Sequence, residues 1–301
     1  MRTITTLLLL LSLQSMAQQG PKWRKISNAA PWPKSYNYQL FSFRDTLWVL
    51  HPKGVWYSTD GQKWKASALG NPIYNHAFLD YILFNNELMG LGYFKGNIEQ
   101  FEFRPIIFSS TNMRSWDTIS KASRLPQRFF YHPFVFQNQL WIIGGEDKQT
   151  SFADIWKSSN GVQWQQVVKE APFGKSSNSQ VVTHNNKLYL LNNDVWTSTD
   201  AIHWEKLTDA IVPGQEIFGY TAVVWKEHIW LLGCNRNGRF SSEVLYSKDG
   251  KKWQAARAPW SPRGGVAATV FKGKIYMTGG KYGGTPDHTE FIYSNDLWVL
   301  E

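Results

Sequence analysis

Short apolar runs separated by polar turns recur along the whole chain, and no segment sustains the 3.6-residue period of a helix. Five turns share Ser at the first place, Asp or Asn at the third and Trp at the seventh. In such a turn the first and third side chains accept hydrogen bonds from nearby amides, and Gly, fourth in three copies, suits a left-handed backbone. We expect each turn to join two strands and to direct its Trp between sheets. The turns begin at Ser58, Ser110, Ser158, Ser198 and Ser247.

A second element, a tight polar turn followed by a short apolar run, recurs six times. Turn pairs such as Asn85-Asn86, Asn185-Asn186 and Lys272-Gly273 tolerate the positive φ angles of a hairpin. With the extended run before each pair, every unit reads as four antiparallel strands. Successive turn tryptophans are 40 to 52 residues apart, which is the spacing of propeller blades. The pattern therefore predicts an all-β fold of six blades.

The two ends of the chain together complete one unit. Residues 295–298 match the start of a third strand, but the chain stops before the following turn and outer strand. Residues 19–23 match the end of such a turn, and a strand continues from Trp23. We therefore expect this N-terminal strand to be the outer strand of the last blade, which closes the ring and removes its open edges.

The double glycines Gly144-Gly145 and Gly279-Gly280, with Asn295-Asp296-Leu297-Trp298 after the second, resemble kelch repeats. The Ser-x-Asp turns are similar to the Asp-box of sialidases but one residue shorter, and four units lack the double glycine. The resemblance implies a divergent, six-bladed kelch-like β-propeller. In such propellers, ligands meet the face formed by the loops between second and third strands and by the loops that enter each new blade.

The N-terminal residues 1–17 have the pattern of a secretory signal peptide, with Arg2, an apolar run over 7–13 and a small residue at Ala17. We expect residues 18–301 to form a single domain in the periplasm or outside the cell. No Cys follows the apolar run, so no membrane anchor is expected. With Cys234 as the sole cysteine, the chain must be stabilised by packing instead of internal disulfides.

The composition of the chain limits the kinds of partner that we expect it to bind. Hydrophobic residues make up 43% and the chain holds 16 Trp, ample for a packed core. The net charge is +9, but Lys and Arg are scattered among turns, so we expect no nucleic acid partner. The seven His residues have no metal-ligand spacing. We expect a monomer without metal or cofactor.

The candidate site residues lie in the loops of the expected ligand face. An acid, a base and a cation for catalysis are available from Glu146, Glu243, Arg236 and Arg239. Ligand-binding candidates are two aromatics after Ala-Pro, two arginines near such loops, and two residues of the last long loop. The alternative is that the aromatics fill the wedge between blades and that one of the arginines, in the kelch strand-entry position, has a structural role. These six candidates are Trp32, Trp260, Arg263, Arg128, Tyr282 and His288.

Two functions remain open from the sequence. The first is a binding module for a carbohydrate or a protein partner, without catalysis. The second is a glycan-related enzyme, because six blades and export resemble the periplasmic N-acetylneuraminate epimerases. Sialidases need three arginines that no spacing here identifies, and galactose oxidase, a copper-dependent kelch-like propeller, has seven blades and extra domains. Convergence of Arg236 or Arg239 with Glu146 or Glu243 in one pocket would favour the enzyme, whereas open Trp32 and Trp260 would favour binding.

Overall fold

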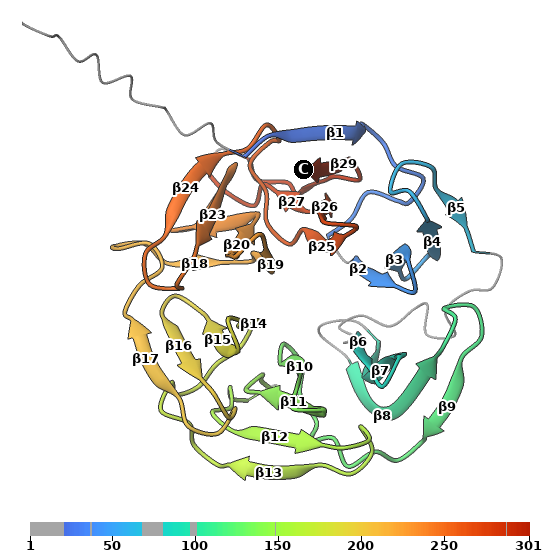
Figure 1. Ribbon diagram of the computed structural model, residues 1–301, viewed down its shortest axis with the longest axis vertical. Coiled ribbons are helices and arrows are strands. Elements are labelled where there is room, and N and C mark those ends of the chain that lie inside the picture. Colours follow the sequence, from blue (N-terminus) through green and yellow to red (C-terminus); the bar gives the residue numbers. More distant parts are fainter. Residues whose placement is uncertain (1–20, 37, 68–80, 97–100, 148, 287) are drawn as a thin grey trace, which may run out of the picture.

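The computed structural model describes residues 21–36, 38–67, 81–96, 101–147, 149–286 and 288–301. In these ranges all regular structure is β-strand, as the sequence predicts, and six antiparallel sheets have four strands each. The sheets are arranged around one central axis, with the first strand of each sheet nearest to it (Figure 1). The predicted all-β propeller fold is therefore confirmed. No described residue belongs to a helix of the length and apolar character that a membrane span needs.

The first strands begin at one face of the molecule and run away from it beside the axis. They are β2 (Gln39–Phe43), β6 (Tyr81–Phe84), β10 (His132–Phe136), β14 (Gln180–His184), β19 (Thr221–Trp225) and β25 (Ala267–Phe271). The second strands return antiparallel to that face. They are β3 (Thr46–His51), β7 (Glu87–Gly96), β11 (Gln139–Ile143), β15 (Lys187–Leu191), β20 (His228–Leu232) and β26 (Lys274–Thr278).

The third and fourth strands form the outer half of each sheet. The third strands are β4 (Gly54–Ser58), β8 (Phe101–Ser110), β12 (Ile155–Ser158), β16 (Val195–Ser198), β23 (Glu243–Ser247) and β29 (Leu297–Leu300). The fourth strands are β5 (Lys65–Ala66), β9 (Asp117–Ser120), β13 (Gln165–Val168), β17 (Glu205–Thr208), β24 (Gln254–Arg257) and β1 (Trp23–Ser27).

The N-terminal strand β1 belongs to the same sheet as the C-terminal strand β29. The two strands are antiparallel, with Trp23 opposite Leu300 and Lys25 opposite Trp298 (Figure 1). The ammonium of Lys25 lies 4.7 Å from the Trp298 ring centroid, a cation–π contact across the pair. The pairing of the two chain ends that the sequence predicts is therefore present.

The first and second strands are joined by two-residue turns in which both residues have positive φ. The predicted pairs Asn85-Asn86, Asn185-Asn186 and Lys272-Gly273 adopt this geometry. Arg44-Asp45, Gln137-Asn138 and Lys226-Glu227 adopt it too, although none of these pairs contains glycine. A right-twisted hairpin imposes this turn on whichever residues occupy it.

The Ser-x-Asp turns use their side chains as the sequence predicts. In the first copy, Ser58 Oγ accepts the N–H of Gly61 at 2.8 Å, and Asp60 Oδ1 accepts those of Gln62 and Lys63 at 2.8 Å. These two amide hydrogen bonds lower the pKa of the Asp60 carboxyl. The fourth place has positive φ in every copy, at Gly61, Met113, Gly161, Ala201 and Gly250.

The core lies between neighbouring sheets. Among the residues that the structure describes, six clusters of buried side chains each combine residues from adjacent sheets. In one of them, Leu47 and Val49 of β3 pack with Tyr276 of β26. In the described part of the chain, two small sheets lie outside the repeat. They comprise β18 (Ile217–Phe218), β21 (Cys234–Arg236) and β22 (Arg239–Ser241), and β27 (Lys281–Tyr282) with β28 (Ile292–Tyr293).

Candidate functional site

A cavity of about 280 Å³ lies where the first strands of all six sheets begin. Since the second strands end at this face and the loops into each sheet enter from it, the cavity opens on the face where the sequence places ligands. We call it the axial pocket. Its walls are formed by Tyr38, Gln39, Leu40, Phe41, Tyr81, His132, Pro133, Gln180, Thr221, Val266, Ala267 and Ala268.

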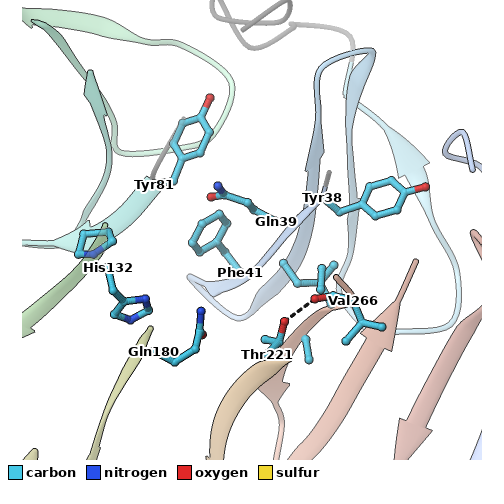
Figure 2. A pocket seen from close by; sticks show the side chains of 12 residues that line it. Tyr38, Gln39, Phe41, Tyr81, His132, Gln180, Thr221 and Val266 are labelled. Carbon is cyan, nitrogen blue, oxygen red and sulfur yellow. Dashed lines mark hydrogen bonds between the residues drawn. The ribbon is translucent and has the colours of Figure 1, made fainter. Parts of the chain in front are cut away.

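The axial pocket combines ring surfaces with uncharged polar groups. Gln39, Gln180 and His132 reach into the space between the strands, and the Phe41 ring lies beside them (Figure 2). The Thr221 hydroxyl donates a hydrogen bond to the Val266 carbonyl, which ties β19 to the residue before β25. Among the residues given above, none is Arg, Lys, Asp or Glu.

His132 does not supply a charge at neutral pH. Burial among the strands lowers the pKa of its imidazole to about 4, and a hydrogen bond with the Val181 backbone opposes this only in part. The ring is therefore neutral at pH 7, with one nitrogen as donor and the other as acceptor. The described wall of the axial pocket is uncharged in solution near neutrality.

Sequence reasoning missed these residues because it searched the loops. The usable signal was the repeat itself: Gln39, Tyr81, His132, Gln180 and Thr221 each begin a first strand of their units. In a repeat arranged around an axis, equivalent positions next to the axis lie close together. The residues that begin the first strands should therefore surround one common space.

Arg128 and Arg263 are buried in equivalent ion pairs with the protein's own carboxylates. Arg128 contacts Asp154 at 2.6 and 3.0 Å and donates to the Gly144 carbonyl at 2.7 Å. Arg263 contacts Asp296 and donates to the Gly279 carbonyl at 3.2 Å. Arg263 thus has the structural role given as the alternative, and Arg128 shares it, because the bidentate position of each guanidinium is filled within the fold.

Trp32 and Trp260 are also buried, with exposed fractions of 2% and 4%. The Trp32 indole N–H donates to Thr278 Oγ1 at 3.1 Å, and its ring meets Trp64 edge to face at 4.7 Å. Trp260 meets the Trp23 ring edge to face at 4.5 Å. Both rings fill the wedge between neighbouring sheets, which is the structural alternative given for them, and neither is an open stacking surface.

The four catalytic candidates do not meet in the axial pocket. Arg236 and Glu243 form an ion pair at 2.6 Å, both from the segment between β20 and β24. Arg239 lies opposite Arg236 in the β21–β22 pair, and Glu146 bridges to Phe129 and Ser151 through its backbone. None of the four is among the residues that form the pocket wall.

Tyr282 and His288 are brought together in the loop between β26 and β29. Their rings lie 5.0 Å apart at 67°, edge to face, with Tyr282 half-buried and His288 exposed. Within the described ranges, no group of three or more His, Cys, Asp and Glu side chains is placed to hold a metal ion.

The antiparallel sheets are arranged around one axis (Figure 1). Double glycines follow two of the second strands, and a buried Arg–Asp pair contacts each of these double glycines. Together these features define a kelch-like β-propeller. Residues 114–272, just over half of the chain, match the family model of the DUF6242 beta propeller domain, and the chain belongs to that family.

Two further comparisons agree with this fold. The chain is 23% identical over 175 residues to the Kelch repeat protein M-T8 of Myxoma virus (strain Lausanne). This alignment covers 53% of this chain and 32% of the viral protein. The match thus spans about a third of that relative's length. The solved structure of YjhT superposes with a TM-score of 0.71 at 13% identity, over 91% of this chain and 96% of that one. At such identity the likeness concerns the fold alone.

Proposed function

We propose that this protein is an exported, closed six-bladed propeller that binds a neutral carbohydrate in the axial pocket without catalysis of its own. The observation that carries this proposal is the wall of that pocket, to which all six first strands contribute residues and five of them contribute uncharged polar or aromatic side chains. The six four-stranded sheets and the β1–β29 pairing support a closed six-bladed ring. Export is proposed from residues 1–17, which lie outside the described residues.

A sugar suits this wall for two physical reasons. Its hydroxyl groups both donate and accept, as do the amides of Gln39 and Gln180, and the neutral His132 ring, whose N–H bonds the Val181 backbone, offers its other nitrogen as an acceptor. Its apolar C–H faces pack against rings such as Phe41. A pocket with a few placed polar groups among ring surfaces is the usual form of a small-ligand site.

The alternative, a glycan-related enzyme of the epimerase or sialidase type, receives less support. A sialic acid carries a carboxylate, and the described pocket wall offers it no cation. Arg236 and Glu243 neutralise each other away from that wall. A protein partner on the same face is the other alternative, and the binding experiment distinguishes it.

The experiment is a glycan array probed with purified residues 18–301, followed by calorimetry on the sugars that bind. Gln180→Ala removes an amide from the pocket wall and should weaken binding about tenfold, because an unpaired sugar hydroxyl costs 1 to 2 kcal/mol, roughly. The matched control is Gln165→Ala, an exposed glutamine on the outer strand β13, which should bind like the parent. If no sugar binds, or if both variants bind equally well, the proposal is wrong.

A further inference from the structure

Exposed aromatic and aliphatic side chains gather on one side of the axial pocket. Their exposed fractions run from 36% to 48%. This is unusual here, because most of the large apolar side chains in this fold are buried. We call this surface the aromatic shelf. It comprises Tyr36, Phe218, Phe291, Ile292 and Tyr293.

The aromatic shelf adjoins the pocket through the segments that enter three first strands. Phe218 comes three residues before Thr221 of the pocket wall, and Tyr36 comes two residues before Tyr38. Gly265, which lies beside Tyr36, directly precedes Val266 of the same wall. Because neighbouring Cα atoms are about 3.8 Å apart, the shelf begins at the rim of the pocket.

Direct contacts join these segments into one surface. The Gly265 N–H donates to the Gly219 carbonyl at 2.7 Å, which links the segment before β25 to the segment before β19. A Cβ on Gly265 would lie 3.4 Å from the Tyr36 Cβ, and its φ of +64° also favours glycine. The Tyr36 and Tyr293 rings stack at 5.8 Å and 19°, so the shelf continues onto β28.

Lys281 supports these rings from β27. Its ammonium lies 4.4 Å from the Tyr36 ring centroid and 4.5 Å from that of Phe291. No carboxylate in the described ranges forms an ion pair with it, and its ammonium makes cation–π interactions with both rings. Lys281 also pairs with Tyr293 through the β27–β28 ladder. The rings are therefore held in place although they face solvent.

We propose that the aromatic shelf is a second subsite and that the natural ligand is an oligosaccharide. The end unit occupies the axial pocket and the following units lie over Tyr293 and Phe218. The pocket, at about 280 Å³, is at the small end for ligand sites, so a longer chain must leave through its mouth, where it meets the shelf. Ring faces already fixed in position cost little entropy when a sugar face covers them. This inference rests on the proposed carbohydrate function.

The test compares chain lengths. Isothermal titration calorimetry on residues 18–301 uses gluco-, manno-, galacto- and N-acetylglucosamine oligosaccharides of one to four units. In the series that binds, affinity should rise roughly three- to tenfold from one unit to three, the range expected for ring-face contacts. Tyr293→Ala should remove this gain and leave the affinity for the single sugar unchanged, whereas Gln180→Ala should weaken every length. The control is Ile119→Ala, which removes another exposed large apolar side chain, on β9 and outside the shelf.

The outcomes separate the two proposals. Binding that depends on Gln180 but not on chain length, or a chain-length gain that survives Tyr293→Ala, overturns the shelf and leaves the pocket intact. Binding of no sugar at any length overturns both and assigns the exposed rings to a protein partner. A gain that Ile119→Ala also removes would mean a general loss of structure, and the subsite would then be rejected.

Discussion

Replacement of Arg263 by Ala should destabilise the protein strongly, because Arg263 is a structural residue instead of a ligand contact. Its side chain is 4% exposed and its partner Asp296 is 14% exposed. Besides Asp296, the guanidinium donates to the carbonyls of Ser261 and Gly279, each at 3.2 Å, and to the Ser261 hydroxyl at 2.9 Å. Truncation would leave the Asp296 carboxylate buried, and among the described residues its remaining side-chain donor would be the Trp298 indole at 2.8 Å.

The expected loss is about 3 kcal/mol of unfolding free energy, the lower part of the range for breaking a buried pair, since Asp296 keeps some contact with water. Arg24→Ala is the control within the same sheet. Arg24 contacts Glu301 at 2.6 Å, but the two side chains are 51% and 44% exposed, so its removal should cost less than about 1 kcal/mol.

Urea unfolding at pH 7 measures both variants through the transition midpoint and its slope. A double variant, Arg263→Met with Asp296→Asn, should recover part of the loss because no buried charge is then left unpaired. Equal losses for Arg263→Ala and Arg24→Ala would refute the argument. So would a stable Arg263→Ala protein that no longer binds sugar, since that result would return Arg263 to the ligand.

Three further predictions concern backbone, pH and the catalytic alternative. Gly61→Ala should cost more than about 2 kcal/mol in thermal unfolding, because its Cβ would lie 2.3 Å from Tyr276 Oη; Gly174→Ala, with the same φ but open space, should cost only about 1 kcal/mol. The folded-state pKa of His132 is about 4, below the usual value, so the unfolded chain takes up a proton first as pH falls. Stability should therefore decline between about pH 6.5 and 4, and less steeply in His132→Gln; an unchanged slope would contradict this. Arg236→Ala should leave sugar affinity in calorimetry unchanged, and a loss above tenfold would restore the enzyme hypothesis.

The strand and turn pattern of the fold could be read from the sequence because it is local and repeated. Ser58 and Asp60 accept amide hydrogen bonds as expected, since such turns are specified by a few neighbouring residues. The pairing of β1 with β29 could also be predicted, because the missing part of one repeat was visible at the other end.

The candidate site could not be predicted in the same way. Arg128 and Trp32 have the chemistry of ligand contacts, and only their partners in three dimensions, Asp154 and Thr278, identify them as structural. No motif in the sequence around Gln180 identifies it as a site residue, because its place in the pocket follows from the convergence of six strands at the axis. Burial and convergence are properties of the whole ring, whereas turn chemistry is a property of seven residues.

The sheet that contains both β1 and β29 makes the first and last strands of the chain mutually dependent. During synthesis, β1 has no partner until Leu297–Leu300 has emerged, so its backbone groups stay unpaired while all the strands between them are made. The same adjacency makes the protein suitable for circular permutation. Linking the two ends and opening the chain at an exposed hairpin such as Asn185-Asn186 would place β1 and β29 on one continuous segment, and refolding should then become faster.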